Sequence, residues 1–196
     1  MNFCSNCAQK ITKKIPDGDN RQRFVCESCS QIYYQNPKII AGCLPLYENR
    51  VLLCRRAIAP RKGYWTLPAG FLENGEAASE GAKRETFEEA NATVNLSHLY
   101  NLFNLPHISQ IYMFYIGELA NLDFSPGEES LETKLFLETE IPWTELAFPV
   151  VALTLKKYFK NKKDNTYPFT EEDIRAGFDG DSESPLLNES SAFPKS

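Results

Sequence analysis

The sequence predicts a mixed α/β sandwich preceded by a small cysteine-rich module. Two pairs of cysteines lie within the first thirty residues, and Asn36-Pro37 then breaks the chain. Beyond this break, apolar strand-like runs stand on both sides of one helix-forming stretch, and a second such stretch follows. Strands around one helix, with another helix behind them, indicate helices packed on a mixed sheet. We therefore expect a module over 1–36, a domain over 37–162 and a polar C-terminal tail over 163–196.

The bulk composition narrows the class of protein. At 196 residues with 42% hydrophobic and 24% charged residues, the chain suits one domain plus a small appendage. No apolar run approaches the ~20 residues that span a bilayer, and the N-terminus lacks the features of a secretory signal. We therefore expect a cytoplasmic protein without a membrane partner. The net charge of −5 disfavours nucleic-acid partners, but a bound cation would still allow a small phosphorylated substrate.

Four cysteines predict a zinc ribbon. Cys4, Cys7, Cys26 and Cys29 form two Cys-x2-Cys pairs separated by eighteen residues. Each pair brings two sulfurs to one ion, and the intervening loop folds back to complete a tetrahedron. Four thiolates leave no coordination position for water, so we expect a structural Zn²⁺ that stabilises a segment with very little core.

Two further sequence features leave alternatives open. Cys43 and Cys54 stand alone in apolar runs, where we expect reduced core cysteines, and a disulfide is the alternative. Residues 1–36 hold five basic and three acidic residues. This mild positive charge favours a solvated face or a partner surface over a nucleic-acid site.

The elements of the domain follow from periodicity and turn residues. Strands are expected over 38–47, 51–55, 64–70, 94–105, 110–119 and 134–136. Helices are expected from about 77 to 90, where Ala, Glu, Lys and Arg dominate, and from about 148 to 158. After Lys163 the chain is polar and irregular, so we expect a mobile tail.

The first helix carries a concentration of carboxylates. At 100° per residue, Glu88 lies 60° to one side of Glu85 and Glu89 lies 40° to the other. Such like charges destabilise an isolated helix by a few tenths of a kcal/mol per pair, and a cation relieves the repulsion. Oxygen ligands favour Mg²⁺ or Mn²⁺. Glu76 would lie 180° from Glu85, so we expect Glu76 in the preceding loop, where it can brace Arg84.

Residues 70–92 resemble the Nudix box of the Nudix hydrolases, G-x5-E-x7-R-E-U-x-E-E-x-G-U, where U is a bulky apolar residue. Its six fixed positions would coincide by chance on the order of once in 10⁵ sequences, which argues against a merely solvated acidic helix face. Two positions depart from the box, because Thr86 occupies the first U and Asn91 replaces the Gly. Asn is the next-best residue for the left-handed conformation that ends such a helix, so we expect the metal-binding face to be intact.

The resemblance implies a Nudix α/β/α sandwich and metal-dependent cleavage of a diphosphate linkage. It implies that Glu85, Glu88, Glu89 and the Gly70 carbonyl bind Mg²⁺ or Mn²⁺, with Arg84 and Glu76 as structural support. Glu129, in a later Gly-Glu-Glu loop, is the candidate for a further catalytic ligand or base. A solvated loop acid is the alternative at that position.

The attached ribbon narrows the resemblance to two groups of Nudix proteins, the NADH pyrophosphatases and the FAD/ADP-ribose pyrophosphatases. The stretches 65–71 and 126–132 resemble the second group, and the SQPWPFPxS signature of the NADH enzymes is absent from the sequence. We therefore expect a dinucleotide-type substrate, FAD or ADP-ribose, with NADH as the alternative. A non-catalytic nucleotide sensor is a further alternative. Related enzymes also suggest a homodimer.

Several side chains are candidates for contacts with the substrate. Arg55 and Arg56 could meet a phosphate or ribose, although a solvated basic loop is an equal alternative. Trp65 and Tyr112, and with them Tyr64 and Phe71, could stack on an adenine or flavin ring. Core packing is the alternative for most of these aromatic residues.

Overall fold

The computed structural model describes residues 1–175 of the chain. The chain divides into two compact units, Met1–Pro37 and a second unit that begins at Lys38. In the described part of the chain, no helix has the length and apolarity needed to cross a membrane. The expected mobile tail over 176–196 lies outside the described residues.

The first unit is a three-stranded antiparallel sheet with the order β1-β2-β3. Its strands are β1 (Ile11–Lys14), β2 (Arg23–Cys26) and β3 (Ile32–Tyr33). Only Cys4, Val25 and Cys26 among its hydrophobic residues are buried. So small an apolar core cannot offset the entropy lost on folding, and the stability of this unit must therefore come from its cysteines.

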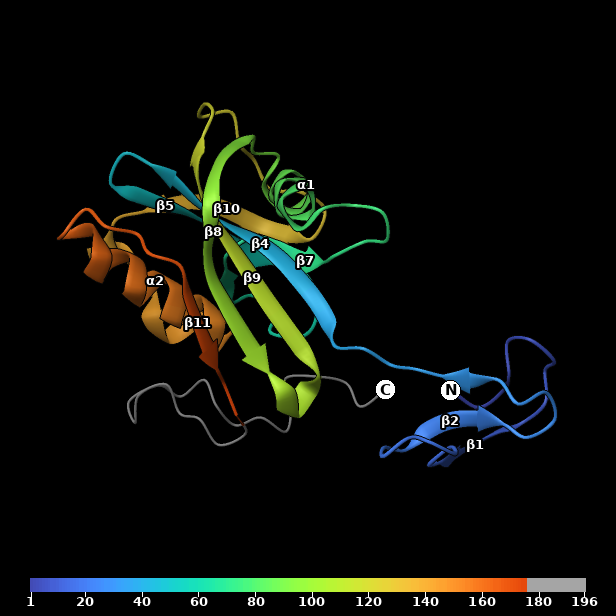
Figure 1. Ribbon diagram of the computed structural model, residues 1–196. Coiled ribbons are helices and arrows are strands. Elements are labelled where there is room, and N and C mark those ends of the chain that lie inside the picture. The colour runs from blue at the N-terminus through green and yellow to red at the C-terminus, as the bar shows by residue number, and fades with distance from the viewer. Residues whose placement is uncertain (176–196) are drawn as a thin grey trace. The chain divides into compact units, whose positions relative to one another are not determined.

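An eight-stranded mixed sheet forms the second unit (Figure 1). Its main path has the order β10-β5-β4-β9-β8-β11, while β6 pairs with β5 and β7 pairs with β4. The pairs β4–β9 and β8–β11 are parallel, and the others are antiparallel. The strands are β4 (Lys38–Tyr47), β5 (Arg50–Arg56), β6 (Trp65–Thr66), β7 (Ala69–Phe71), β8 (Val94–Leu105), β9 (Gln110–Leu119), β10 (Ser130–Phe136) and β11 (Thr170–Asp173).

Two α-helices cover opposite faces of this sheet, α1 (Ala78–Ala90) and α2 (Pro149–Lys162) (Figure 1). Short 3-10 turns lie at Pro106–Ile108, Glu138–Glu140 and Trp143–Glu145. The mixed sheet between two helix layers, preceded by a small cysteine-rich sheet, confirms the predicted α/β sandwich.

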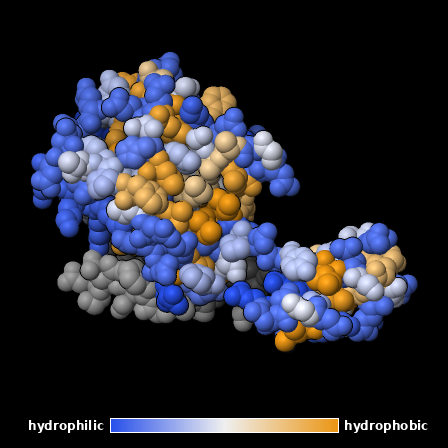
Figure 2. Space-filling view, viewed as in Figure 1, coloured by the Kyte–Doolittle hydropathy of each residue, from blue (hydrophilic) through white to orange (hydrophobic). Residues whose placement is uncertain are grey.

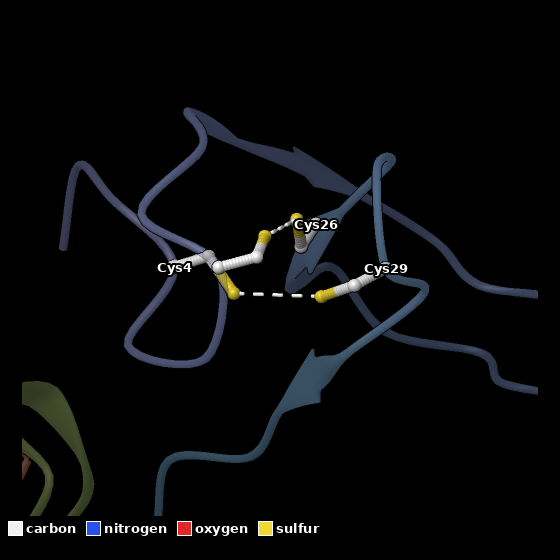
Figure 3. A group of neighbouring side chains, drawn as sticks. Cys4, Cys26 and Cys29 are labelled. Carbon is white, nitrogen blue, oxygen red and sulfur yellow. Dashed lines mark hydrogen bonds between the residues drawn. The ribbon is translucent and has the colours of Figure 1, made fainter.

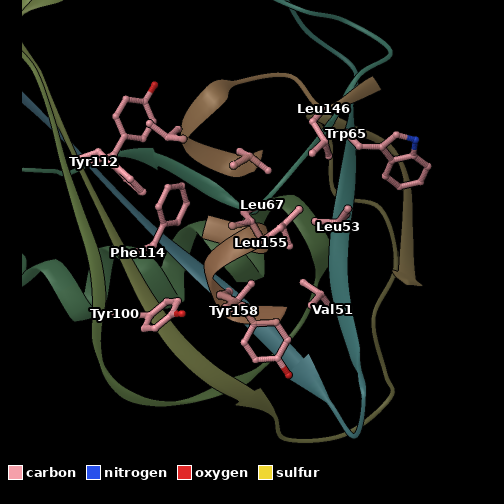
Figure 4. Packing of buried hydrophobic residues seen from close by; sticks show 14 of the residues in the cluster. Val51, Leu53, Trp65, Leu67, Tyr100, Tyr112, Phe114, Leu146, Leu155 and Tyr158 are labelled. Carbon is pink, nitrogen blue, oxygen red and sulfur yellow. The ribbon is translucent and has the colours of Figure 1, made fainter. Parts of the chain in front are cut away.

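Alternation along the strands divides the core between the two helices. On β4, Leu44 belongs to the large cluster that also contains α2 residues such as Leu155 and Tyr158 (Figure 4). The neighbouring Cys43 belongs to a smaller cluster with Cys54 and Ala90, the last residue of α1. Both cysteines are buried and free, so the disulfide alternative is wrong.

The polar stretch after α2 corrects one prediction, because residues 170–173 form a strand and are not part of a tail. This strand, β11, pairs in parallel with β8. Asn101 Nδ2 donates to Thr170 Oγ1 (2.7 Å), and Ile174, which follows the strand, is buried. The sequence did not predict this strand because its residues are polar and show no apolar alternation. Polar side chains hold it to β8 instead.

Three element boundaries also differ from expectation. The strand expected over 64–70 is two short strands, β6 and β7, separated by Leu67 and Pro68, and proline lacks the N–H that a continuous ladder needs. Strand β10 begins four residues earlier than expected, at Ser130. Helix α2 extends four residues further, to Lys162.

One face of the second unit gathers hydrophobic side chains. Figure 2 shows them over the region of β8 and β9. Leu102 on β8 lies opposite Met113 on β9, and Leu99 lies opposite Tyr115. All four residues are half-buried.

Candidate active site

The start of α1 places Glu76 outside the helix. The Glu80 carboxylate accepts a hydrogen bond from the Ala77 N–H (2.7 Å), which satisfies one of the free donors at this helix end. The helix therefore begins at Ala78, and Glu76 lies in the loop before it. At the other end, Asn91 adopts the left-handed conformation with φ of 47°, as predicted.

Arg84 joins three carboxylates. It donates to Glu76 through Nε (3.0 Å) and Nη2 (2.7 Å), and through Nη1 to Glu85 (2.7 Å) and Glu88 (3.0 Å). Arg84 lowers the pKa of Glu76 to about 2, with help from the Glu73 backbone. Because the planar guanidinium binds Glu76 at two points, it is fixed in orientation and in turn fixes Glu85 and Glu88.

Glu85 lies against the backbone of β7. A Cβ built on Gly70 would come within 2.3 Å of the Glu85 carboxyl carbon, so only glycine fits there without displacing that carboxylate. Burial raises the pKa of Glu85, although Arg84 opposes the shift. The structure thus brings Gly70 and Glu85 together.

Glu89 is the most buried of the three helix carboxylates. Its residue is 6% exposed, and its Oε2 atom has no hydrogen-bond partner. Burial, and then the negative charge of Glu85, raise the pKa of Glu89 to about 8, while Arg56 opposes the shift. A buried carboxyl with an unsatisfied oxygen is costly unless a cation or a proton binds it.

Glu129 approaches the same carboxylates from the loop before β10. Its negative charge contributes to the raised pKa of both Glu85 and Glu89. Its carbonyl accepts a hydrogen bond from the Ala57 N–H (2.8 Å). The Gly127 N–H, two residues earlier, donates to the Glu89 carbonyl (3.0 Å), so the loop that carries Glu129 lies against the end of α1.

The two neighbouring arginines of β5 lie in different surroundings. Arg56 donates through Nε to the Pro60 carbonyl (2.8 Å), lies over the Phe148 ring at 5.2 Å, and acts electrostatically on Glu89. Arg55 instead donates to the Gly63 carbonyl (2.9 Å) and lies 3.8 Å from Glu132 on β10. Of these two arginines, Arg56 acts on the Glu89 carboxyl, while Arg55 is paired with Glu132.

Trp65 and Tyr112 correct the predicted stacking surface. Trp65 is 7% exposed and packs edge-on against Phe136, with ring centroids 4.9 Å apart. Tyr112 is 8% exposed and stacks on Phe114. Both rings belong to the large buried cluster shown in Figure 4, so packing against their neighbours occupies them. Phe71, next to Gly70, remains 52% exposed.

The carboxylates fit a divalent cation in chemistry, and they are less tightly gathered than the cysteines. Within residues 1–175, only the four cysteines form a group of three or more potential ligand residues with all ligand atoms within 4.8 Å of one another. The glutamates are more dispersed, and Arg84 holds two of them. The all-oxygen donor set and the unsatisfied Glu89 oxygen fit Mg²⁺ or Mn²⁺.

The four cysteines of the first unit have the geometry of a closed zinc site. Sγ of Cys4 lies 3.6 Å from Sγ of Cys29 (Figure 3), and Sγ of Cys7 lies 3.4 Å from Sγ of Cys26. Tetrahedral Zn–S bonds of about 2.3 Å place sulfurs about 3.8 Å apart, close to these distances. The cluster therefore fits a structural Zn²⁺.

Hydrogen bonds around the cluster favour the thiolate form of Cys4 and Cys29. The Gln9 backbone also lowers the pKa of Cys7, but hydrogen bonds with the other three sulfurs outweigh it and raise that pKa. The Tyr33 hydroxyl donates to Cys4 Sγ at 3.0 Å and lowers the pKa of Cys4 to about 6. Asn6 Nδ2 donates to Cys29 Sγ at 3.7 Å. Such contacts around the ligands orient the sulfurs and stabilise the charged form that binds metal.

Sequence reasoning missed the side chain of Asn91. Asn91 was expected only to adopt the left-handed backbone conformation that ends the helix. Its Nδ2 atom, however, lies 3.1 Å from Ser125 Oγ. Thirty-four positions separate these residues, and a contact at such a distance along the chain leaves no local pattern. The one available signal was the replacement of the box glycine by a residue with hydrogen-bonding capacity.

Each of the two units matches a known protein family. Residues 2–35 match the family model described as "Nudix N-terminal", a zinc ribbon, and residues 36–162 match the model of the NUDIX domain.

Individual relatives of the chain also carry the names of pyrophosphatases, but the substrates in those names differ. The chain is 30% identical over 170 residues to the human protein named "NAD(P)H pyrophosphatase NUDT13, mitochondrial", covering 85% of this chain and 45% of that protein. It is 27% identical over 121 residues to an "ADP-ribose pyrophosphatase" of Methanocaldococcus jannaschii, covering 59% of this chain and 69% of that protein. The chain thus spans about half the length of its human relative.

A solved structure extends the similarity over nearly the whole described chain. The crystal structure of a NUDIX hydrolase from Nitrosomonas europaea is 51% identical, with a TM-score of 0.87. The match covers 89% of this chain and 99% of that one.

Proposed function

The chain belongs to the Nudix hydrolases with an N-terminal zinc ribbon, and from this premise we propose that it is a divalent-metal-dependent pyrophosphatase. Its reaction is the hydrolysis of the diphosphate linkage in a nucleoside diphosphate derivative. The observation that carries the proposal is the buried Glu89 carboxyl, which has an unsatisfied oxygen and whose pKa is raised by burial and by the charges of Glu85 and Glu129. Such a cluster of acidic groups is stabilised when a cation binds it.

Each residue of the cluster then has a role. Glu85, Glu88, Glu89 and the Gly70 carbonyl would hold Mg²⁺ or Mn²⁺, which supplies charge neutralisation at the phosphates and activates water. Arg84, itself fixed by Glu76, keeps two of the carboxylates in place.

Glu129 is proposed as the base. It accepts a proton from the attacking water as the water oxygen bonds to one phosphorus. The bridging P–O bond breaks on the opposite side, and the second phosphate leaves.

Arg56 is proposed to bind a substrate phosphate. Its guanidinium is anchored through Nε and is electrostatically coupled to Glu89, whereas Arg55 is bonded away from the site. A fixed guanidinium offers a phosphate a fork of N–H donors. Phe71, which is half exposed beside Gly70, replaces the buried Trp65 and Tyr112 as the proposed ring-stacking residue.

FAD or ADP-ribose is the proposed substrate, and NADH is the alternative. The sequence stretches that resemble FAD/ADP-ribose enzymes and the similarity to an archaeal ADP-ribose pyrophosphatase support the first choice. The similarity to a human NAD(P)H pyrophosphatase supports the second.

Chromatography of the products from FAD, ADP-ribose and NADH with Mg²⁺ tests the proposal. We expect AMP release from at least one substrate, and FMN plus AMP as the preferred products would select FAD. A purified protein that binds these nucleotides and cleaves none of them would instead be a nucleotide sensor. That result would refute the enzymatic proposal.

A cytoplasmic homodimer completes the proposal. The six cysteines form no disulfide, which suits a reducing compartment. The half-buried apolar side chains of β8 and β9 offer a surface that a second copy could cover (Figure 2). Light scattering of the purified chain measures its mass, and a monomer at micromolar concentration would contradict the dimer.

A further inference from the structure

We propose that Asn91 is a positioning residue, whose side-chain amide ties the loop over 125–130 to the C-terminal end of α1 and thereby sets the place of Glu129. The inference rests on the proposed function, because the place of Glu129 matters to catalysis only if the chain cleaves a diphosphate. It starts at the point where this chain departs from the Nudix box, since Asn91 stands where the box has glycine.

The amide of Asn91 contacts the loop at three acceptors. Nδ2 lies 3.2 Å from the Ser125 carbonyl, 3.1 Å from Ser125 Oγ and 3.2 Å from the Pro126 carbonyl. The two amide hydrogens are shared among these acceptors. A glycine would satisfy the left-handed backbone at this position equally well, but it would make none of these contacts.

The loop also satisfies the last carbonyls of the helix. The Ser125 N–H donates to the Ala90 carbonyl (2.9 Å), and the Gly127 N–H donates to the Glu89 carbonyl (3.0 Å). These carbonyls have no partner within the helix itself. A Cβ on Gly127 would lie 1.7 Å from the Glu88 carbonyl oxygen, so the loop approaches the helix too closely for any other residue.

Glu129 lies two residues beyond this contact and is held from the other side as well. Its carbonyl accepts from the Ala57 N–H (2.8 Å), and the Ser130 N–H donates back to the Gly127 carbonyl (3.1 Å). The loop is therefore fixed to the same helical turn that carries Glu88 and Glu89. Small shifts of this loop would change the distance from Glu129 to the attacking water, and proton transfer is sensitive to that distance.

The substitution Asn91→Gly tests the amide alone. Glycine adopts positive φ without strain, so the backbone and the box pattern are kept while the three contacts are lost. We expect kcat to fall about two- to tenfold, the range of one lost hydrogen-bonding group, with KM nearly unchanged. Asn91→Asp should lower kcat further, because its carboxylate would face two carbonyl oxygens.

Asn165→Gly is the matched control. Asn165 also has positive φ, 50°, in the turn between α2 and β11, and its side chain makes no hydrogen bond to any residue in the described part of the chain. The same substitution there should leave kcat and KM at wild-type values. Equal losses at both positions would show a general effect of Asn→Gly and overturn the proposal.

A double variant separates positioning from mere stability. If Asn91 acts through Glu129, then Asn91→Gly should cause no further loss of kcat in a Glu129→Gln background. Losses that multiply would overturn the proposal, as would an unchanged kcat in Asn91→Gly.

Amide hydrogen exchange over 125–130 gives a readout that does not need activity, and we expect faster exchange in Asn91→Gly. An inactive wild type would refute the proposed function, while unchanged exchange would refute the tie between Asn91 and the loop.

Discussion

The two regions of the chain that suit metal ions differ in how far their ligands are gathered. In the ribbon, the four sulfurs already lie within 4.8 Å of one another. On α1, the carboxylates are spread, and Arg84 rather than a common centre holds Glu85 and Glu88. The burial of the glutamates also varies, since the Glu88 side chain is 55% exposed and the Glu89 residue only 6%.

This difference corresponds to two uses of metal. A closed set of four sulfurs holds an ion for stability and leaves no position for a reactant. A dispersed set of oxygens on a fixed helix leaves room for waters and phosphate oxygens around the ion. The predictions that follow test whether the first region serves the fold and the second serves the chemistry.

The largest effect is expected for Glu89→Gln. The substitution keeps the shape of the side chain and removes the charge that a cation requires, so kcat should fall about a thousandfold with the fold intact. Mg²⁺-dependent hydrolysis of FAD or ADP-ribose measures it. Glu118→Gln, at an exposed position on β9, is the control and should keep full activity. A Glu89→Gln variant that retained a tenth of the activity would show that the Glu89 carboxylate is not needed to bind the catalytic metal.

Loss of zinc should affect the other region. Structural zinc contributes about 10–16 kcal/mol of apparent folding free energy in ribbon-sized peptides, so Cys26→Ser should lose bound zinc and unfold residues 1–37. Because the second unit has its own core, kcat should stay within about threefold of wild type. Elemental analysis and kinetics on the same sample check both parts. A hundredfold loss of kcat would show that the catalytic domain depends on the folded zinc ribbon.

Arg84→Lys should have an intermediate effect. A lysine keeps the charge but cannot bind Glu76 at two points while also reaching Glu85 and Glu88. We expect kcat to fall roughly tenfold and the Mg²⁺ concentration for half-maximal activity to rise. Arg21→Lys in the ribbon, where Arg21 is exposed, should change neither quantity.

The smallest effect is a dependence of stability on pH without added Mg²⁺. The folded pKa of Glu89, about 8, lies above its ordinary value of 4.5, so the folded state binds more protons between these values. Stability should therefore fall as pH rises from about 5 to 8. The urea midpoint measures this trend, and Glu89→Gln should flatten it. Added Mg²⁺ should also flatten it, because a cation replaces the proton.

The pKa of Glu76 has the opposite consequence at low pH. Its folded value of about 2 lies below its ordinary value of 4.5. The stability that Glu76 contributes is therefore present above pH 4.5 and is lost as pH falls towards 2. Glu76→Gln should remove this loss, whereas a midpoint unchanged by the substitution would mean that the Arg84 pair adds no stability.

Much of the fold was predictable because apolar periodicity determines it. The bounds of β4, β8 and β9 agree with the ranges read from the sequence, since each strand alternates or is continuously apolar. Strand β11 was missed because Thr-Glu-Glu-Asp carries no apolar signal and depends on side chains of β8.

The candidate site shows the same limit. The spacing of Glu85, Glu88 and Glu89 on one helix is local, so the shared face followed from the helical repeat. Their unequal burial depends on the strands and loops that pack around α1, and no pattern within the helix reports it. For the same reason, Trp65 could not be distinguished from a stacking residue before its contact with Phe136 was known.

The acidic strand β11 has a consequence for self-association. An edge strand offers free backbone groups to which another chain can add, and natural sheets discourage this with charge. Within residues 1–175, strand β11 closes one edge of the sheet and carries Glu171, Glu172 and Asp173 in four residues. Lys157 and Arg175 pair with the last two of these acids, and Glu171 has no ion pair in this part of the chain. Two copies joined edge to edge through β11 would bring these acidic side chains opposite each other, and the ion pairs offset only part of the repulsion. Continuous sheets across copies, and aggregates that grow by the same pairing, are therefore disfavoured at this edge, and the homodimer proposed above would have to use another surface.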